Sequence, residues 1–510
     1  MTTRAHGPVS DDLSLRESSH EKHFRPFREG IVGVNAQFDS PYGKCPIVYA
    51  DWTAGGRLFD PIEQRILQTF GPYVANTHSE SSVTGTTMTR AYEEAHRRIK
   101  AHVNASDRDV IVTPGSGMTA AINKFQRILG LRIPEQWKDR VRLSREERPV
   151  VFITHMEHHS NHTSWLETIA DVAVIPPDEN GLVEPERLRE LLAEYEDRPL
   201  KIGSFTACSN VTGIRTPYHT LASIMHEHGG YCFIDFAASA PYDSIDMHPS
   251  DPDARLDAVF FSPHKFLGGP GSSGVMVFDS SLYKLKVPDH PGGGTVDWTN
   301  PWGQHRFIAD IEAREDGGTP GFLQAIRAAM AIDLKEQMGP DTIALREHEL
   351  VEILFEELRS IPGVHILAPE VSDRLSIVSF YVENLHYNLI VKLLNDRFGV
   401  QTRGGCSCAG TYGHYLLHVD PTRSKRITDL IDEGDRSQKP GWVRISLHPT
   451  TTDEEARYIG NALRRVVAHA DEWVKDYDYS PESNEFTHRN AAEAPDVAEW
   501  LRVGPCEPNG

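Results

Sequence analysis

The stretch FFSPHKFLGGPG, Phe260–Gly271, decides which fold we expect of this chain. It overlaps the end of the apolar run LDAVFF, which is typical of a buried strand, and a second such run, SGVMVFD, follows at once. Lys265 therefore stands where the backbone turns sharply at a strand end. A lysine held there loses solvation, and a desolvated amine titrates more easily and becomes a nucleophile. A surface lysine in a glycine-rich hairpin is the alternative that the rest of the sequence must exclude.

The composition limits the class of protein. The chain has 510 residues, enough for two or three domains, and 39% hydrophobic with 25% charged residues is typical of a globular protein. With 73 acidic and 52 basic side chains the formal charge is -21, which disfavours nucleic acid or a membrane surface as partner. No apolar run approaches the ~20 residues of a membrane helix, and the polar start is no secretory signal. Six cysteines are too few for a disulfide scaffold, so we expect a cytoplasmic enzyme or binding protein.

Short apolar runs alternate with amphipathic segments through the first two thirds of the chain. The strand-like runs are RDVIVT, RPVVFIT, LKIGSF, GYCFID, LDAVFF and SGVMVF. Segments with helical spacing lie between them, among them MTAAINKFQRILGL, EPERLRELLAEYE and TLASIMHEHG. Strand, helix and strand in succession predict an α/β fold with a mainly parallel central sheet that is covered on both faces.

The order of these patterns predicts four segments. Residues 1–45 form an N-terminal lead-in that packs with the small domain or is partly irregular, and residues 46–325 form the large domain. A helix-like run, GFLQAIRAAMAIDLKEQMG, then leads into a smaller α+β C-terminal domain, residues 326–477. Residues 478–510 form a polar C-terminal tail without a clear packing signal.

Unusual polar residues follow one strand-like run after another, at the edge where open parallel sheets bind ligands. After RDVIVT comes a glycine loop, PGSGMT, which opens a helix whose first amides are free to bind a phosphate. After RPVVFIT comes HMEHHSNHTSW, whose four histidines allow two interpretations, a metal site or an imidazole that lies on an aromatic ring. Asp235 ends GYCFID, where a buried carboxylate needs a cationic partner. Ser262, His264 and Lys265 follow LDAVFF.

These features match one ligand in particular. Pyridoxal 5'-phosphate carries a phosphate, an aromatic ring, a ring nitrogen that is best kept protonated, and an aldehyde that traps a lysine as a Schiff base. Asp235 precedes Lys265 by about one strand–connection–strand unit, so the carboxylate and the amine are expected on neighbouring strand ends. The sequence therefore predicts pyridoxal 5'-phosphate as the cofactor.

From about Tyr49 to Tyr458 the chain resembles the class V aminotransferase family of fold-type I pyridoxal-phosphate enzymes, and within it the cysteine desulfurases. The resemblance implies a fold-type I PLP-dependent transferase with a cofactor-binding large domain, and a homodimer with shared active sites. It implies that Lys265 forms the Schiff base. The implied cofactor contacts are Gly117, Met118 and Thr119 in the phosphate loop, Ser262 and His264 on the phosphate, His158 on the ring, Asp235 on the ring nitrogen, Asn210 near the phenolic oxygen, and Thr319 on the neighbouring subunit's phosphate.

A second stretch, QTRGGCSCAGTYGHY, carries the rest of the resemblance. Arg403, together with Asn210, corresponds to the substrate-binding residues of the family, and a guanidinium suits a carboxylate. Cys408 falls where related desulfurases have the cysteine that attacks the substrate sulfur. The implied products are L-alanine and a persulfide on Cys408, with L-cysteine as substrate and a sulfur-acceptor protein as a further partner. Five residues span at most ~17 Å, so the segment must fold back or swing, which Gly404, Gly405 and Gly410 permit.

Two departures from the family pattern leave alternatives open. Ala238 stands where the family commonly has a glutamine that bonds the phenolic oxygen, and Cys406 and Ser407 replace two histidines. This loop is more similar to the desulfurase-type domain of molybdenum-cofactor sulfurases, but we expect the 33 residues after Tyr477 to be too few for their further domain. Either thiol of the CSC stretch could be the reactive one, and both could be structural. The alternatives are therefore an aminotransferase, lyase or epimerase in which Cys408 is non-catalytic, and a non-catalytic scaffold or sulfur-transfer partner.

Overall fold

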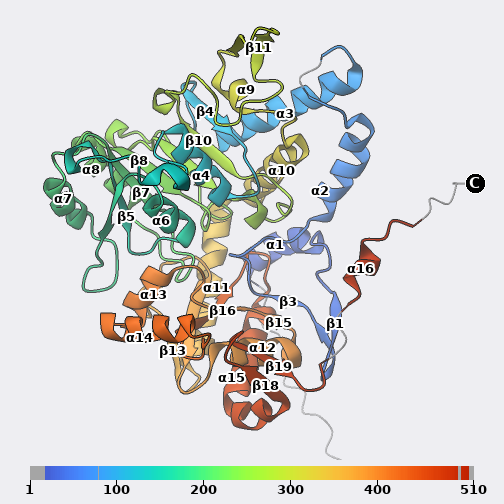
Figure 1. Ribbon diagram of the computed structural model, residues 1–510. Helices are drawn as coiled ribbons and strands as arrows, with labels where there is room; N and C mark the ends of the chain where they lie inside the picture. Colours follow the sequence, from blue (N-terminus) through green and yellow to red (C-terminus); the bar gives the residue numbers. More distant parts are fainter. Residues whose placement is uncertain (1–17, 78–79, 492–494, 505–510) are drawn as a thin grey trace, which may run out of the picture.

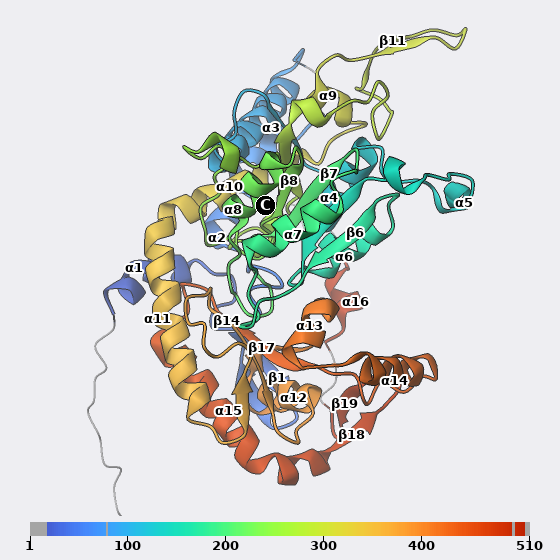
Figure 2. The same cartoon turned by 90° about the vertical axis from the view of Figure 1, so that its left-hand side faces the viewer.

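The computed structural model describes residues 18–77, 80–491 and 495–504. The beginning of the predicted lead-in and the end of the predicted tail therefore lie outside the described residues. Figure 1 shows a large part built on a central sheet and, below it, a smaller part with its own sheet. The view in Figure 2 separates the same two parts and shows α11 running from one to the other. No helix among the described residues is long and apolar enough to cross a membrane.

The large part is organised by a seven-stranded sheet in the order β4-β10-β9-β8-β7-β5-β6. Strand β10 is antiparallel to both of its neighbours, and the pairs from β9 to β6 are all parallel, which confirms the mainly parallel sheet that the sequence predicts. β6 has no counterpart among the predicted strands. The strands are β4 (Asp109–Val112), β5 (Val150–Thr154), β6 (Asp171–Ile175), β7 (Lys201–Thr206), β8 (Tyr231–Asp235), β9 (Ala258–Phe261) and β10 (Val275–Asp279).

Helices cover both faces of this sheet because both faces are apolar. On β5, Val150 and Phe152 belong to one core cluster, and Val151 and Ile153 belong to the other. Side chains of a strand alternate between its faces, so the uninterrupted apolar run supplies two cores. One face packs against α3 (Val83–His102), α7 (Pro185–Glu194), α8 (Tyr218–Glu227) and α10 (Phe322–Met338). The other packs against α4 (Met118–Ile128) and α6 (His159–Leu166).

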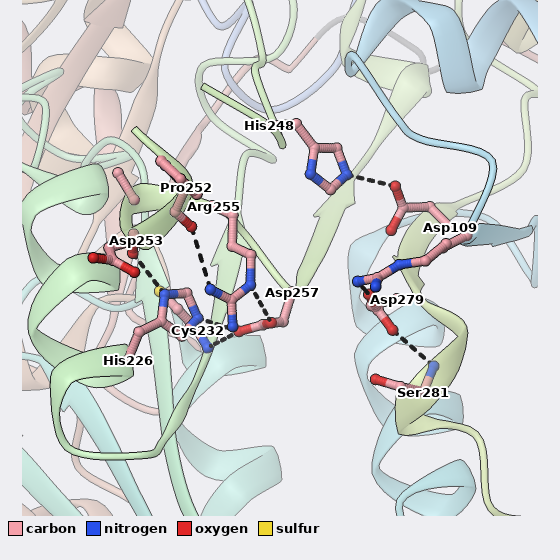
Figure 3. Close-up of polar contacts among 12 residues, drawn as sticks. Asp109, His226, Cys232, His248, Pro252, Asp253, Arg255, Asp257, Asp279 and Ser281 are labelled. Atoms are coloured by element: carbon pink, nitrogen blue, oxygen red, sulfur yellow. Dashed lines mark hydrogen bonds and ion pairs between the residues drawn. The ribbon is translucent and has the colours of Figure 1, made fainter. Parts of the chain in front are cut away.

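Buried carboxylates close the edge of the sheet at which β4, β8 and β9 begin (Figure 3). Asp257 accepts a hydrogen bond from the Cys232 amide at 2.7 Å and pairs with His226 Nε2 at 2.8 Å. Asp109 pairs with His248 Nε2 at 2.6 Å. A buried carboxylate is costly unless the protein supplies such donors. These acids therefore stabilise the strand starts, and the opposite edge carries the polar residues predicted to bind a ligand.

The smaller part is an antiparallel sheet in the order β13-β14-β17-β16 covered by helices, which is the α+β arrangement that the sequence predicts. Its apolar core lies between the sheet and α11, α12 and α15. The elements are β13 (Val364–Ile366), β14 (Ile377–Val382), β16 (Arg403–Gly405), β17 (Trp442–Ser446), α11 (Pro340–Arg359), α12 (Tyr387–Phe398), α13 (Gly410–Leu416), α14 (Pro421–Asp432) and α15 (Asp453–Trp473).

The described part of the N-terminal lead-in packs against the smaller part, where α1 (Ser19–Glu29) contacts α11 and β2 (Gly43–Pro46) contacts α12. β2 pairs with β1 (Gln37–Ser40), and β3 (Val48–Tyr49) pairs in parallel with β15 (Val400–Gln401). The chain then crosses to the large part through α2 (Asp60–Gln64) and the turns that follow it. The smaller remaining elements are α5 (Glu135–Lys138), β11 (Val296–Thr299), β12 (His305–Phe307) and α9 (Ile311–Glu315).

A hairpin of β18 (Tyr477–Ser480) and β19 (Glu485–His488) occupies the start of the predicted polar tail and packs against α12. The contact is largely polar, since Asn388 Nδ2 donates to the Asn484 carbonyl at 2.6 Å and Asn484 Nδ2 donates to Tyr387 Oη at 2.6 Å. Such a contact leaves no apolar pattern in the sequence. The chain then continues to α16 (Val497–Trp500). The division of the chain into four segments stays a prediction.

We expect Gly399→Ala to destabilise the join between β3 and β15. Gly399 has φ 69°, and a Cβ there would lie 1.8 Å from the Pro46 carbonyl oxygen. Gly434 is the matched control, because it has φ 92° and open space around its Cβ position. Alanine at Gly434 should cost about 1–2 kcal/mol of backbone strain, and alanine at Gly399 at least about 2 kcal/mol more. Equal urea-unfolding midpoints for the two variants would contradict the close backbone approach.

Candidate functional site

A cavity of about 290 Å³ opens where β4, β7, β8 and β9 end. Residues of the smaller part form one wall of it, so the cavity lies between the two parts. Eleven of the twelve residues predicted for the site line it. They are Gly117, Met118, Thr119, His158, Asn210, Asp235, Ser262, His264, Lys265, Arg403 and Cys408.

Thr319 is the predicted residue that the structure places elsewhere. It is exposed, and its Oγ1 donates to Asn76 Oδ1 at 3.2 Å. This placement leaves open the predicted role of Thr319, which concerns a neighbouring subunit and not the cavity of its own chain.

Asp235, which is buried, and Lys265, which is half-buried, are two oppositely charged groups of the cavity. Burial raises the pKa of Asp235 to about 6, against the opposing effects of the Ala237 N–H, which donates to its carboxylate at 2.8 Å, and of the Lys265 charge. Burial likewise lowers the pKa of Lys265 to about 8, and the Asp235 charge opposes that shift. The site therefore provides a partly neutral amine at neutral pH and a carboxylate that is short of hydrogen-bond donors. A protonated ring nitrogen would supply the missing donor.

The start of α4 forms an anion cradle with the turn that carries Lys265. Met118 N donates to Ser262 Oγ at 2.9 Å, and His264 Nδ1 donates to the Ser116 carbonyl at 2.8 Å. A Cβ on Gly117 would lie 2.9 Å from His264 Cε1, so only glycine leaves room for this approach. The N-terminus of an 11-residue helix, hydroxyls and an imidazole are groups that bind phosphate.

His158 presents a neutral imidazole to the cavity. It caps the N-terminus of α6, because its Nδ1 accepts a hydrogen bond from Ser160 N at 3.1 Å. The proton of the ring is therefore on Nε2. Burial lowers the pKa of His158 to about 3, and the nearby Lys265 charge adds to that shift. An uncharged, fixed ring is suited to lie against an aromatic ligand.

Glu157 ties together the elements behind His158, and sequence analysis did not identify it. Its carboxylate accepts hydrogen bonds from Thr154 Oγ1 at 2.7 Å, Thr206 N at 2.9 Å and Asn161 Nδ2 at 2.7 Å. These donors belong to β5, β7 and α6. Burial raises the pKa of Glu157 to about 8. The Glu157 carboxylate thus fixes the ends of two strands relative to the turn that carries His158.

Two guanidinium groups and one carboxylate form the wall contributed by the smaller part. Arg403 Nε donates to Asp51 Oδ2 at 3.0 Å, and Arg444 donates to Asp51 Oδ1 at 2.6 Å. Arg444 also donates to the Asn210 carbonyl at 3.0 Å and is buried, whereas Arg403 is half exposed. One positive charge in this group is not neutralised by Asp51. The arrangement can bind a small anion such as an amino-acid carboxylate.

Sequence analysis missed Arg444 and Asp51, although Arg444 left a signal. It is the only charged residue in WVRIS, a strand buried at every position. A charge in the middle of such a strand requires a partner. Nothing in the sequence indicates that the partner is Asp51, almost four hundred residues earlier.

The Cys406–Cys408 loop folds back toward the cavity and is bound on several sides. Gly405 has φ 104°, and Ser407 and Cys408 have left-handed φ values of 50° and 57°. Asn210 Nδ2 donates to the Ser407 carbonyl at 2.7 Å, and His159 N donates to the Cys408 carbonyl at 2.8 Å. Two non-glycine residues in this strained conformation need such support from their surroundings.

The two thiols of this loop have different surroundings. Cys408 is exposed and lines the cavity, whereas Cys406 is half-buried and packs against the core of the large part. A third thiol, Cys208, also lines the cavity but is buried, and burial raises its pKa. A thiol must be accessible and deprotonated to react. Cys408 has the access that the other two thiols lack.

Ala238 lines the cavity without offering a hydrogen-bond donor, at the position where the family commonly has glutamine. Asn210 bonds the loop through Nδ2, and its buried Oδ1 has no partner among the described residues. An unpaired buried amide oxygen is costly. A donor group of a bound ligand would satisfy it.

The four histidines that left a metal site open are spread over separate contacts. His159 Nε2 accepts from Gly410 N at 3.0 Å, and His155 packs edge-on against Tyr412 and Tyr415. Among the described residues, no group of three or more histidine, cysteine, aspartate or glutamate side chains could hold a metal ion.

The class V aminotransferase model matches residues 48–459, most of the chain. The chain belongs to the class V aminotransferase family. Membership makes it an enzyme of a pyridoxal-phosphate-dependent type, as the sequence predicts. Curated relatives include a probable cysteine desulfurase of Halalkalibacterium halodurans, which is 28% identical over 73% of this chain and 86% of the relative. A cysteine desulfurase of Haloferax volcanii is 27% identical over 76% of this chain and 89% of the relative.

Solved structures confirm the fold. A cysteine desulfurase from Thermococcus onnurineus, in its apo form, aligns with a TM-score of 0.68 and 21% identity over 86% of this chain and 97% of its own. The cysteine desulfurase CsdA of Escherichia coli, in an S-sulfonic acid form, aligns with a TM-score of 0.67 and 21% identity over 87% of this chain and 98% of its own.

We expect the amine of Lys265 to react as the neutral group at a lower pH than an exposed lysine does. Its neutral fraction rises as pH increases through about 8, compared with ~10.4 for an unperturbed lysine. Trace labelling of the cofactor-free protein with acetic anhydride, followed by peptide mass spectrometry, should give a labelling midpoint near pH 8. In Asp235→Asn that midpoint should fall, because the Asp235 charge raises the pKa of Lys265. An unchanged labelling midpoint in the variant would show that the Asp235 charge does not influence the pKa of Lys265.

Proposed function

We propose that the chain is a cysteine desulfurase that uses pyridoxal 5'-phosphate to convert L-cysteine into L-alanine and a persulfide on Cys408. The observation that carries the proposal is the placement of an accessible thiol on the wall of the cavity that holds Lys265 and Asp235. The names of the curated relatives support the same activity. We place the enzyme in the cytoplasm, where a free thiol persists.

The residues of the cavity fit the cofactor. The α4 cradle with Ser262 and His264 would hold the phosphate, His158 would lie on the ring, and Asp235 would bond the ring nitrogen. When bound, the cofactor supplies an electron-withdrawing ring that weakens bonds at the α and β carbons of an amino acid. Lys265 would bind its aldehyde, and the depressed pKa of this amine suits it to exchange protons with the substrate.

Arg444 and Arg403 would orient the substrate through its carboxylate. They approach the cavity from one wall and share Asp51, which fixes the spacing of the two guanidinium groups. Arg444 is the stronger anchor, because it is buried and an ion pair is less screened there. The bound substrate carboxylate would also exclude water from this wall of the cavity.

Cys408 would accept the sulfur. A bond forms between Cys408 Sγ and the substrate sulfur while the carbon–sulfur bond of the substrate breaks, and the electron pair of that bond stays with the carbon. Lys265 Nζ then supplies the proton that completes L-alanine. The sulfur remains on an exposed residue, from which a sulfur-acceptor protein could take it.

The proposal includes a homodimer. Thr319 is exposed and distant from its own cavity lining, as expected of a residue that binds the phosphate of a neighbouring subunit. Its bond to Asn76 would hold the hydroxyl in place for that contact.

We expect Cys408→Ala to abolish the release of alanine and sulfide from L-cysteine in the presence of a reductant, because the sulfur then has no acceptor. Cys406→Ala should retain most of the activity, since this thiol faces the core. Lys265→Ala should lower turnover by at least ~10³-fold, because the variant can neither bond the cofactor aldehyde nor transfer the proton. The measurement is alanine and sulfide per mole of purified enzyme. Equal turnover in wild type and Cys408→Ala would make the loop structural and leave a lyase or aminotransferase on the same cofactor.

We expect Arg444→Lys to raise the KM for L-cysteine by roughly 10–100-fold, because a charge-assisted bond to the carboxylate is worth ~1.5–3 kcal/mol. Arg403→Lys should have a smaller effect, since Arg403 is half exposed. Cysteamine, which lacks the carboxylate, serves as the matched substrate, and its KM should change little in either variant. A parallel loss with both substrates would show that Arg444 supports the fold of the site and not the carboxylate.

A further inference from the structure

The C-terminal segment carries an apolar face that nothing covers among the described residues. Val497, Trp500 and Leu501 of the segment lie at positions i, i+3 and i+4 of a helical turn, so they share one face. They are 59%, 73% and 83% exposed. Among the described residues, the hydrogen bonds of α16 stay within the segment itself, for example from Ala498 N to Asp496 Oδ1 at 3.0 Å. Burial of Trp500 and Leu501 would contribute several kcal/mol of hydrophobic stabilisation, and the single chain does not bury them.

A groove of about 530 Å³ lies on the large part, between α2, the turn that follows it, α3 and α10. Its floor is apolar and is formed by Phe59, Ile62, Phe70, Ala95, Met330 and Leu334. Two further apolar side chains are exposed on the same stretch of chain, Leu67 at 71% and Tyr73 at 42%. A groove of this size accepts an indole with its neighbours.

Charge at the edge of the groove complements the segment. Arg65 lines the groove and forms no ion pair with a described residue, whereas the two acids of the lining, Glu94 and Asp333, pair with Arg98. Asp496 precedes the apolar face of α16 and accepts hydrogen bonds only from backbone amides among the described residues. An acidic residue next to Trp500 therefore matches an unpaired guanidinium beside the groove.

The position of the two surfaces favours a second copy of the chain as the occupant. The segment leaves the β18–β19 hairpin, which lies in both views at the opposite end of the molecule from α3 (Figures 1 and 2). The six residues from 491 to 497 span at most ~20 Å. α2 and α16 both lie on the right-hand side of Figure 1, with α16 clear of the main body. A two-fold dimer that joins this side to its symmetry mate pairs each segment with the groove of the other copy.

We propose that Val497–Leu501 of one copy packs into the groove between α2, α3 and α10 of a second copy, as an exchanged arm that holds the dimer together. The proposal rests on the homodimer of the proposed function, but not on the reaction it catalyses. The arm lies beyond residues 48–459, which match the family, so it would be an addition to the family's common fold.

A photo-crosslink tests the arm directly. Trp500→p-benzoylphenylalanine is introduced into cofactor-loaded enzyme, and ¹⁵N-labelled and unlabelled protein are mixed, dissociated, reassociated and irradiated. We expect crosslinked peptides that join the arm to residues 58–70 or 326–338, with about half of them pairing a labelled with an unlabelled chain. Crosslinks confined to chains of one label would place the arm in its own groove and overturn the proposal, as would crosslinks to any other surface. Leu345→p-benzoylphenylalanine, on the exposed side of α11, is the control and should not reach the groove.

Dimer dissociation gives a second readout. We expect the double variant Trp500→Ser and Leu501→Ser to raise the dissociation constant in sedimentation velocity at least about tenfold, which is ~1.4 kcal/mol. Val503→Ser is the matched control, because Val503 is 95% exposed and lies beyond the end of α16, outside the proposed arm of residues 497–501. An unchanged dissociation constant in the double variant, or a monomeric wild type, would overturn the arm. Neither readout needs turnover, so a failure of the desulfurase assay leaves this test intact, and the reverse also holds.

Discussion

The site depends on two opposite charges that are partly or wholly desolvated at the ends of neighbouring parallel strands. β8 ends in Asp235, and β9 leads into the turn that carries Lys265. Burial alone would neutralise each group, and each charge partly offsets that effect on the other. The acids at the opposite edge differ, because Asp257 and one oxygen of Asp109 each receive several protein donors. At the edge where β8 and β9 end, Asp235 and Lys265 lack such protein partners among the described residues and face the cavity.

Asn210 joins this edge to the smaller part. Its backbone carbonyl accepts from Arg444, and its side chain donates to the carbonyl of Ser407, so one residue of the large part holds both the anion-binding wall and the thiol loop. A shift of the two parts relative to each other would therefore displace the guanidinium groups and Cys408 together. Asn210 thereby links the two proposed roles, carboxylate binding by the guanidinium groups and sulfur transfer at Cys408, through one residue.

Much of the site could be predicted because its residues follow apolar runs directly, and adjacent strand ends meet in a parallel sheet. Lys265, Asp235 and His158 are of this kind. The parts that could not be predicted depend on contacts between distant segments or on polar packing. The Asp51–Arg444 pair joins the start of the chain to its last long strand, and the β18–β19 hairpin attaches through Asn388 and Asn484. The strand β10 was predicted as SGVMVF, but its antiparallel direction was not, because its residues are as apolar as those of a parallel strand.

The backbone of the CSC stretch argues that its two cysteines have separate roles. Ser407 and Cys408 both adopt left-handed conformations, so the chain turns sharply between the two thiols. Ser407 is held inside by Trp442 Nε1, which donates to its hydroxyl at 3.2 Å. With the middle residue anchored, Cys406 packs against the core while Cys408 points to the cavity. This geometry, and not the local sequence, distinguishes Cys408, the proposed sulfur acceptor, from Cys406, which packs against the core.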